Sequence, residues 1–570
     1  METEIFGVIL IIYLGILLAY PLGRHIAKVF GGERNWMTFM APLERWIFRF
    51  CGIDPNREMN WKEFLVALLT INAVWFVYGF LMLIFQGSLF LNPDGNSGMA
   101  PDLAFNTIIS FVVNCNLQHY SGESGLTYLT QLAVVMFLQF VSAATGMAAL
   151  AGVYKALKEG THQTIGNFYN YFVKSLTRIL LPLSVGLATL LILEGTPMTF
   201  KGKETITTLE GMEQSISQGP AAGMIAIKQL GTNGGGYFGV NSAHPLENPT
   251  YLTNIAETVS IILLPIAMVF AFGFFLNRRK LAWVVFGVMT AGFLVFLSGA
   301  MVSELQGNGA LAEMGIAQPM GNMEGKETRF GSAASALWGI CTTATSNGSV
   351  NAMHDSMMPF TGLLLLLDMM INAFYGGVGV GLLNYFVFLI LAVFISGLMV
   401  GRTPEFLGKK VEAREMKIAT LIALLHPFLI LAGTALSSYI LVSYPQAGWS
   451  VQPANWLNNP SYHGFSEMLY EYASASANNG SGFEGLADNN FFWNFSTGLV
   501  LILSRFLPII GPVAIAGLLA QKKQIPSGAG TLQTDTGTFG VMTFAVIFII
   551  AALAFFPALA LGPLAEYFNW

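Results

Sequence analysis

The sequence predicts an all-α polytopic membrane protein with ten transmembrane helices, most of them arranged in four repeated units. Three observations lead to this prediction. The 570 residues are 54% hydrophobic and only 10% charged, which differs strongly from the composition of soluble domains. Apolar runs long enough to cross a bilayer recur along the chain, and a polar loop motif recurs between them. We therefore expect one membrane domain, residues 1–570.

A spanning helix needs about 20 apolar residues, and ten runs of this kind are present. They lie near residues 5–22, 64–85, 127–152, 175–194, 254–276, 281–302, 375–400, 416–441, 491–511 and 541–563. The first run follows Glu2 and Glu4 instead of basic residues. We therefore interpret it as a retained span and not as a signal peptide.

Lysine and arginine residues are distributed unevenly between the loops. The loops that ten spans place on one side carry Arg24, Lys28, Arg34, Arg45, Arg49, Arg57, Lys62, Lys155, Lys158, Lys174, Arg278, Arg279, Lys280, Arg402, Lys409, Lys410, Arg414, Lys522 and Lys523. The opposite loops carry only Lys201, Lys203, Lys228, Lys326 and Arg329. Because basic loops remain in the cytoplasm, this bias predicts that both termini lie outside.

Four shorter semi-apolar stretches interrupt the loops on the outer side. They lie near 101–113, 220–231, 332–344 and 466–477, and each is too short to span. Each begins with a helix-start signal: Pro101 with Asp102, Pro220 behind Ser217, Ser332, and Ser466 with Glu467. We expect re-entrant half-helices, which a bilayer tolerates only where protein or water covers their ends.

Three of these half-helices lead directly into similar tripeptides. These are Thr232-Asn233-Gly234, Ser346-Asn347-Gly348 and Asn478-Asn479-Gly480, and the first loop has Asn116-Leu117-Gln118 at what we interpret as the corresponding place. The repeated unit is span, half-helix, loop, span. It predicts pore repeats at 63–152, 174–276, 281–401 and 416–511, with the first span and its basic loop (1–62) and the last span and C-terminus (541–570) left over.

The repeated loops suit the binding of a dehydrated cation. Glycine tolerates positive φ and lets backbone carbonyls approach an axis, and carbonyl oxygens replace the water shell of potassium in ion filters. The C-terminal ends of half-helices add the negative pole of the helix dipole. One Asn-Gly alone would indicate a surface turn. Three of them, each after a capped half-helix, favour a filter for a weakly hydrated monovalent ion.

Longer stretches of the loops resemble a known family. VNCNLQHYSGE (113–123), TNGGGYFGVNSAHPLENPT (232–250), TSNGSVNAMHDS (345–356), SASANNGSGFEG (474–485) and GRTPEFLGKK (401–410) are similar to the KdpA family of potassium-binding subunits. The resemblance covers nearly the whole chain. It implies a pseudo-fourfold, potassium-channel-like fold of the superfamily of potassium transporters, located in the bacterial plasma (inner) membrane.

The resemblance also implies partners and a source of energy. A separate P-type ATPase subunit, KdpB, would hydrolyse ATP, and accessory subunits KdpC and a small KdpF-like peptide would complete the complex within the lipid bilayer. This chain has neither the nucleotide-binding pattern GxxxxGK[ST] nor the phosphorylation motif DKTG. We therefore expect no catalytic residues and no bound nucleotide in this chain, and no nucleic-acid partner.

The resemblance places potassium-binding filter positions in all four loops. They are Asn114, Cys115, Asn116, Gln118, Thr232, Asn233, Gly234, Thr345, Ser346, Asn347, Gly348, Ser476, Asn478, Asn479 and Gly480. The channel signature TVGYG is absent, and Gln118 is interpreted as standing where the other loops have glycine. The sequence therefore predicts an asymmetric filter.

Two charged residues follow apolar runs and are candidates for the ion path below the filter. Arg505 follows LVLILS and Asp368 follows LLLLL, and charges at membrane depth often have a function. Arg505 would act there as a positive gate against leak. The alternative for both is a snorkelling or loop-end residue.

Other functional classes receive less support from the sequence. His119, His244 and His354 follow the loops without metal-ligand spacing, so potassium is the only metal expected. A stand-alone potassium transporter of the Trk/Ktr type is the nearest alternative, and the extra first and last helices argue against it. A membrane-embedded enzyme is a further alternative, but no nucleophile or metal constellation is visible.

Overall fold

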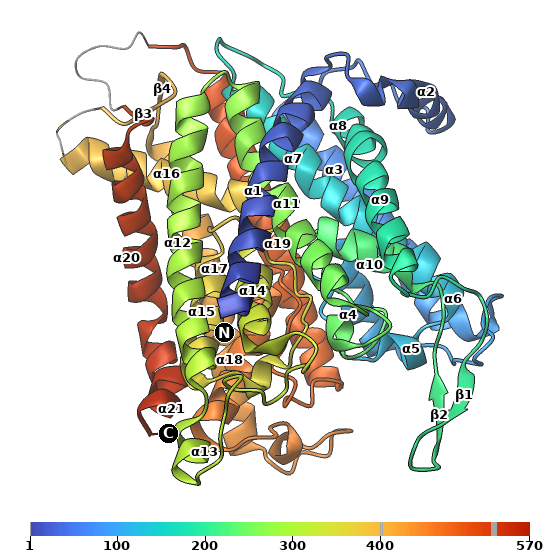
Figure 1. Ribbon diagram of the computed structural model, residues 1–570. Coiled ribbons are helices and arrows are strands. Elements are labelled where there is room, and N and C mark those ends of the chain that lie inside the picture. Colours follow the sequence, from blue (N-terminus) through green and yellow to red (C-terminus); the bar gives the residue numbers. More distant parts are fainter. Residues whose placement is uncertain (1, 400, 402, 526–532, 570) are drawn as a thin grey trace.

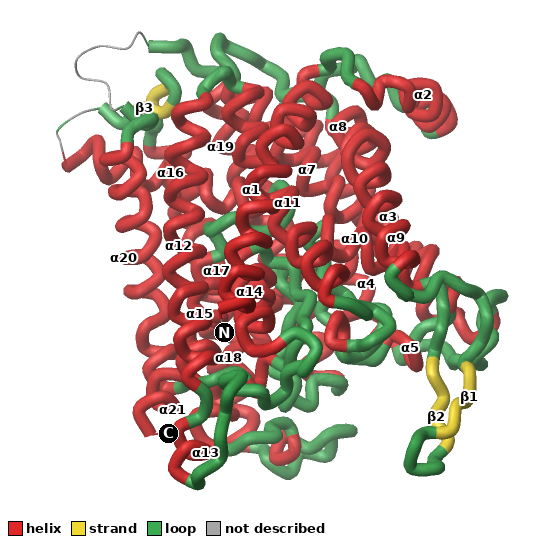
Figure 2. Tube along the Cα trace, in the orientation of Figure 1, coloured by secondary structure: helices red, strands yellow, loops and turns green. Residues whose placement is uncertain are grey.

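The computed structural model describes residues 2–399, 401, 403–525 and 533–569. Within these residues, ten helical segments are long and apolar enough to cross a membrane, and they run roughly side by side (Figure 1). Helices form nearly all of the body, whereas the few strands lie at its ends (Figure 2). The predicted all-α polytopic fold is therefore confirmed.

Ten spanning segments form the body. Seven of them contain one long helix each: α1 (Glu2–Gly31), α3 (Trp61–Phe85), α11 (Tyr251–Phe275), α12 (Arg279–Gln306), α17 (Ala413–Ser443), α19 (Phe491–Ala520) and α20 (Gly537–Leu561). Two contain a π-helical turn, with α6 (Tyr128–Thr130) joined through Gln131–Met136 to α7 (Phe137–Leu157), and α8 (Phe168–Ser175) joined through Leu176–Leu180 to α9 (Leu181–Leu193). The tenth is α16 (Val380–Met399).

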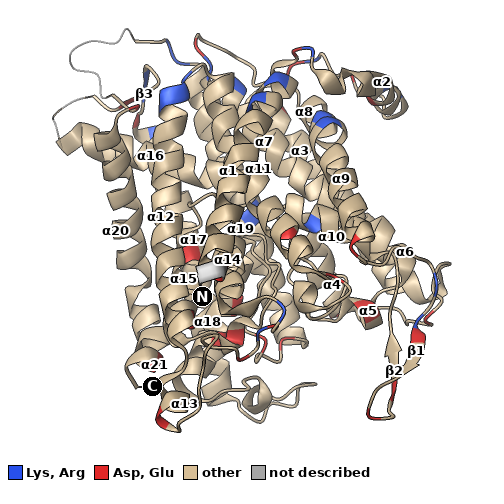
Figure 3. Ribbon diagram, in the orientation of Figure 1, with Lys and Arg blue, Asp and Glu red and all other residues tan. Residues whose placement is uncertain are grey.

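Polar side chains fix where several spans begin. The side chain of Asn60 caps α3, that of Thr250 caps α11 and that of Asn490 caps α19 by accepting hydrogen bonds from first-turn N–H groups. Lysine and arginine gather at one end of the molecule, around α2 and β3, as Figure 3 shows. The uneven distribution of basic residues between the loops is therefore also a distribution in space.

Four shorter helices enter the body from the end opposite the basic loops. They are α4 (Pro101–Val112), α10 (Ala221–Leu230), α14 (Gly331–Ala344) and α18 (Ser461–Ala477). All residues of α14 are buried, and so are all but Gly223 in α10, as a re-entrant helix in a bilayer requires. The fourth begins at Ser461 and not near Ser466, because Pro460 stops the preceding chain and serves as its N-cap residue.

The second span of the third repeat differs from the prediction of one helix over 375–400. It consists of α15 (Pro359–Ile371), a non-helical segment 372–379, and α16. Asn372 ends α15 in the left-handed conformation, and Gly376 and Gly379 also have positive φ. Glycine permits such a backbone, so the polar, glycine-rich stretch between two apolar runs interrupts the span.

The spans divide into inner and peripheral helices. In the most apolar part of each span, 89% of α11 and 72% of the α6–α7 segment is buried, compared with 22% of α3 and of α17. Inner helices surround the half-helices, and peripheral helices present apolar side chains to the surroundings. A membrane protein needs both kinds, because lipid solvates the outer faces.

The remaining elements are short. They are α2 (Ala41–Phe50), α5 (Gly122–Gly125), α13 (Gly309–Glu313) and α21 (Pro563–Asn569), and the strands β1 (Glu204–Thr207), β2 (Glu213–Ile216), β3 (Glu405–Phe406) and β4 (Lys409–Lys410). Strands β1 and β2 pair in an antiparallel hairpin, as do β3 and β4. The two hairpins lie at opposite ends of the molecule (Figure 1).

Candidate ion-binding site

The four half-helices end in tripeptides that have the same backbone conformation. The first residue of each is left-handed: Asn114, Thr232, Ser346 and Asn478 have φ of 63°, 46°, 49° and 52°. The second residue donates its N–H to the carbonyl five residues earlier, over 2.9–3.0 Å in all four cases. The third again has positive φ: 59° at Asn116, 83° at Gly234, 88° at Gly348 and 107° at Gly480. Segments 114–116, 232–234, 346–348 and 478–480 are therefore structural equivalents.

This equivalence corrects the interpretation of the first loop. The counterpart of the three glycines is Asn116 and not Gln118. Asparagine is one of the few residues besides glycine that adopt the left-handed region readily, so the loop keeps the conformation without the Asn-Gly motif. Gln118 instead links the first loop to the second, accepting from the N–H of Gly236 at 2.8 Å and donating to its carbonyl at 3.2 Å.

The four tripeptides form a closed ring. A Cβ on Gly234 would collide with the carbonyl oxygen of Asn347, one on Gly348 with that of Asn479, and one on Gly480 with that of Cys115. The ring closes where Asn114 Nδ2 donates to the carbonyl oxygen of Thr232 at 2.9 Å. Three of the four junctions therefore join backbone to backbone and require glycine, whereas the fourth is made by the side chain of Asn114.

The asparagines in the middle of three tripeptides hold neighbouring backbone in place. Asn233 Nδ2 donates to the carbonyl of Gln139 at 3.2 Å, Asn347 Nδ2 to that of Lys228 at 3.2 Å, and Asn479 Nδ2 to that of Thr342 at 2.8 Å. Cys115 occupies this position in the first loop, and its side chain has no amide group that could form such a hydrogen bond. These three amides are therefore engaged within the protein.

The two remaining residues of the expected set lie outside the tripeptides, Ser476 in the last turn of α18 and Thr345 directly after α14 as its C-cap residue. Thr345 Oγ1 donates to the carbonyl of Cys341 at 2.7 Å, and Ser476 Oγ lies 2.7 Å from Nδ1 of His426. The side chain of Asn116 is different, because it is buried and neither amide atom has a hydrogen-bond partner among the described residues.

A buried polar network supports the second and third tripeptides from behind. The ammonium group of Lys228 contacts Glu247 and donates to Asn241 Oδ1 at 2.6 Å. Asn241 Nδ2 in turn donates to the carbonyl of Gly234 at 2.6 Å. Lys228 falls within the predicted half-helix 220–231. No local sequence pattern indicated that Glu247, in the loop after the second tripeptide, is its ion-pair partner.

A histidine holds the first loop against the fourth repeat. His119 is buried, and its Nδ1 lies 2.7 Å from Asn494 Oδ1 and its Nε2 lies 3.1 Å from Glu471 Oε1. Burial alone would lower the pKa of His119, but the carboxylates of Asp488 and Glu471 raise it to about 9. At neutral pH the charged imidazole therefore links three segments of the chain.

The segment 372–379 lies directly against the ring on the side of the basic loops. The N–H of Gly376 donates to the carbonyl of Ala344 at 2.7 Å, and the N–H of Val378 donates to Thr232 Oγ1 at 2.9 Å. Asn372 accepts from Ser346 Oγ at 2.9 Å and donates to the carbonyl of Ala477 at 3.2 Å. No sequence pattern indicated that this segment contacts the ends of the second, third and fourth half-helices.

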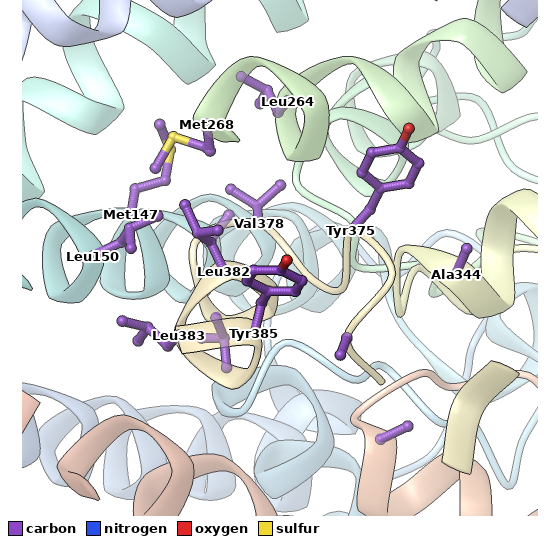
Figure 4. Close-up of a cluster of buried hydrophobic side chains, with 14 of the residues drawn as sticks. Met147, Leu150, Leu264, Met268, Ala344, Tyr375, Val378, Leu382, Leu383 and Tyr385 are labelled. Atoms are coloured by element: carbon purple, nitrogen blue, oxygen red, sulfur yellow. The ribbon is translucent and has the colours of Figure 1, made fainter. Parts of the chain in front are cut away.

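A hydrophobic cluster anchors this segment from the other side. In Figure 4, Val378 lies near Met147 from α7 and Met268 from α11, and Tyr375 lies farther from these two methionines. These side chains are all buried. The side chain of Asn372 and the backbone N–H groups of Gly376 and Val378 therefore face the ring, while the side chains of Tyr375 and Val378 pack into the core.

Arg505 is a buried residue of α19, which is long and apolar enough to span, and Asp368 is a buried residue of the shorter helix α15. Arg505 Nη2 donates to the carbonyl of Ser142 at 3.4 Å, and Ser142 Oγ in turn donates to Asn114 Oδ1 at 2.8 Å. Asp368 accepts from Thr343 Oγ1 at 2.9 Å. Within the described part of the chain, neither residue forms an ion pair.

A cavity beside the fourth half-helix has a volume of about 50 Å³, which is large enough to hold water. Its polar lining includes Asn372, Asn384, His426, Ser476 and Ser504. Neither Arg505 nor Asp368 belongs to this lining. Arg505 is instead close to Gly146, beneath the first and second loops.

Comparisons with known proteins agree on one family. Residues 9–568 match the family described as KdpA, potassium-transporting ATPase A subunit. Relatives named "potassium-transporting ATPase potassium-binding subunit" are 64% identical in Bacteroides thetaiotaomicron and 65% identical in Flavobacterium psychrophilum, each covering 100% of both chains. One from Geobacillus kaustophilus is 46% identical over 98% of both chains.

A solved structure also shares the fold. The potassium transporter TrkH from Vibrio parahaemolyticus aligns with a TM-score of 0.50 at 14% identity, covering 90% of this chain and 98% of TrkH. At that identity the likeness concerns the fold alone. The family match and the full-length relatives show that this chain belongs to the KdpA family, the A subunits of potassium-transporting ATPases.

Proposed function

We propose that the ring of four tripeptides binds a dehydrated potassium ion and passes it onward as the channel-like subunit of an ATP-driven uptake complex. The closed backbone ring at the ends of four half-helices supports this most directly. The proposed filter residues are those of the four loops, with Asn116 in the place of the missing glycine and Gln118 in a supporting position.

Charge and geometry favour a monovalent ion. No tripeptide contains an acidic residue, so attraction would come from carbonyl dipoles and from the C-terminal ends of the half-helices, each equivalent to about half a negative charge. Divalent cations are strongly hydrated and need charged ligands. Weakly hydrated potassium can exchange its water for carbonyl oxygens at much lower cost.

Arg505 and Asp368 would act on the cytoplasmic side of the ring. The guanidinium of Arg505 lies beneath the first two loops, where it would oppose the passive leak of cations. Asp368 would act more indirectly, through Thr343 on the third half-helix. The segment 372–379 would have to rearrange before an ion could leave the ring in this direction, because it is bonded to the ends of the half-helices.

The energy would come from a partner. The full-length relatives are named as potassium-binding subunits of a potassium-transporting ATPase, and this chain lacks the nucleotide motifs. We infer that a P-type ATPase subunit of the KdpB kind hydrolyses ATP, with KdpC-like and KdpF-like accessory chains. The complex would lie in the bacterial inner membrane with both termini of this chain outside.

Reconstitution tests this function. The purified chain should bind rubidium or potassium and hydrolyse no ATP, whereas addition of the ATPase subunit and its accessory chains should give potassium-stimulated hydrolysis. Gly234→Asp should weaken this stimulation, and Gly202→Asp in an exposed loop should not. ATP hydrolysis by the isolated chain, or gradient-driven uptake without a partner as in a Trk-type transporter, would contradict the proposal.

Labelling of introduced cysteines tests the orientation. A cysteine at Gly408 should react only with reagents on the cytoplasmic side, and one at Gly195 only from outside. The exposed native Cys51 would first be replaced by serine. The opposite pattern at either position would reverse the proposed topology.

A further inference from the structure

A second cluster of ionisable side chains lies apart from the ring, at the end of the molecule opposite the basic loops. We call it the carboxylate cluster; it consists of Asp355, His463, Glu467 and Glu566. Asp355 follows the third tripeptide, His463 and Glu467 lie one turn apart on α18, and Glu566 lies on α21. Three separate parts of the chain therefore meet there.

The histidine lies between two carboxylates. His463 Nε2 is 2.8 Å from Asp355 Oδ1, and His463 Nδ1 is 2.8 Å from Glu566 Oε1. Asp355, His463 and Glu467 each offer one ligand atom, and these atoms all lie within 4.8 Å of one another. Such spacing matches a single ion held between one imidazole nitrogen and two carboxylate oxygens.

Glu467 is a buried member of the cluster with one carboxylate oxygen that lacks a hydrogen-bond partner among the described residues. It is 0% exposed, and its Oε2 has no hydrogen-bond partner among the described residues, whereas Oε1 accepts from the N–H and Nδ2 of Asn459. In the described chain, no lysine or arginine forms an ion pair with any of the three carboxylates of the cluster. A buried carboxylate oxygen without a partner is costly, and a cation would remove that cost.

We propose that Asp355, His463 and Glu467 bind a divalent transition-metal ion of the Zn²⁺ class, and that Glu566 orients His463. One imidazole with two carboxylates suits Zn²⁺ better than Mg²⁺ or Ca²⁺, which prefer oxygen ligands throughout. A ligating histidine usually donates its other N–H to a carboxylate, and Glu566 occupies that position at Nδ1. The site is separate from potassium binding in the ring.

Gly485 places no side chain beside the ligand atoms, and solvent can reach the cluster. A Cβ on Gly485 would lie 2.7 Å from Glu467 Oε1 and 2.8 Å from Asp355 Oδ2, so a side chain there would crowd the ligands. The side chains of His463 and Glu566 are 19% and 11% exposed, which gives a route from the surface. A bound ion would clamp the loop after the third tripeptide to α18 and α21.

Metal binding to the full-length chain tests the site. The protein, purified without a histidine tag and freed of metal by chelation, should bind one Zn²⁺ per chain in isothermal titration, and Mg²⁺ or Ca²⁺ in tenfold excess should not displace it. His463→Gln and Glu467→Gln should each weaken Zn²⁺ binding by tenfold or more. Glu566→Gln should weaken it by about 10–100-fold, as expected for a residue that orients a ligand.

Controls separate this site from general misfolding and from the ring. His162→Gln, in the loop after α7, should bind Zn²⁺ as the unaltered chain does, and so should Gly234→Asp. Each variant should still bind rubidium, except Gly234→Asp, in which rubidium binding should be weakened. The proposal is wrong if the unaltered chain binds no stoichiometric Zn²⁺, or if His463→Gln and Glu566→Gln, both folded, bind it with unchanged affinity.

Discussion

The first loop of the ring and the other three reach the same backbone conformation with different residues. The second, third and fourth loops use glycine at the junction and an asparagine amide as a brace. The first uses Asn116 at the junction and Cys115 where the brace would be. The ring therefore requires a residue with positive φ and a correctly placed carbonyl at each junction. Asparagine meets this requirement in the first loop, where glycine is absent.

The loops also differ in what supports them. Behind the second loop lies the buried pair of Lys228 and Glu247, whereas His119 holds the first loop to Glu471 and Asn494. Both arrangements place charge close to a ring in which the tripeptides themselves carry none. Substitutions at Lys228, Gly234, Asn116 and His244 test how each kind of support contributes to the ring.

Lys228→Met should have the largest effect. It leaves Glu247 buried without its partner and releases Asn241, which holds the carbonyl of Gly234. Loss of one partner of a buried pair costs about 3–5 kcal/mol, so the variant should unfold in detergent well below the unaltered chain. The double variant Lys228→Met/Glu247→Leu should recover much of this loss, and equal stability of the single and double variants would contradict the assignment.

Gly234→Ala should mainly affect ion binding. The added Cβ meets the carbonyl oxygen of Asn347 at a backbone with φ of 83°, where alanine costs about 1 kcal/mol before any collision. We expect apparent potassium affinity to fall by about tenfold or more, equivalent to about 1.4 kcal/mol, with poorer rejection of sodium. Gly287→Ala, in a span with open space around it, is the control. Unchanged ion ranking in Gly234→Ala would refute the ring assignment.

Asn116→Gly makes the first loop resemble the others and should have a smaller effect. Glycine keeps the left-handed conformation, and the lost amide has no hydrogen-bond partner among the described residues. Potassium affinity, measured by rubidium competition, should change by about fivefold or less, because one net hydrogen bond is worth about 1 kcal/mol. A loss as large as that of Gly234→Ala would mean that the side chain itself is an essential ligand.

His244 should contribute the smallest effect, through pH. It stacks on Phe238 behind the second loop, and burial together with Arg329 lowers its pKa from 6.5 to about 4. Between these values the unfolded chain binds more protons than the folded one, so stability falls as pH falls from about 6.5 toward 4. His244→Asn, which retains an acceptor for the N–H of Leu246, should reduce the shift in apparent Tm between pH 7 and pH 5 by about 1–2 °C. A larger shift in apparent Tm between pH 7 and pH 5 in this variant would contradict the expected contribution of His244 to the pH dependence of stability.

Much of the fold was predictable, because spans and half-helices leave strong local signals. Ten apolar runs, basic loops and prolines at helix starts need only composition and spacing. The register of the first loop was predicted wrongly because Asn114-Cys115-Asn116 contains no glycine, and only dihedral angles reveal its equivalence. Helix α15 was missed because its apolar run is too short to span on its own, and the span 375–400 was predicted to begin within the non-helical segment 372–379. Partners such as Glu247 of Lys228 or Glu566 of His463 depend on three-dimensional contacts that no local pattern encodes.

Because a single polypeptide supplies all four loops, each level of the ring can hold a different residue. The middle residues of the four tripeptides, for example, are Cys115, Asn233, Asn347 and Asn479. A single codon change would alter only one of these four residues. In a ring of four identical subunits the same change would appear four times. In a ring formed by one chain, a substitution can therefore change one of four equivalent positions at a time. A symmetric tetramer does not permit such single changes.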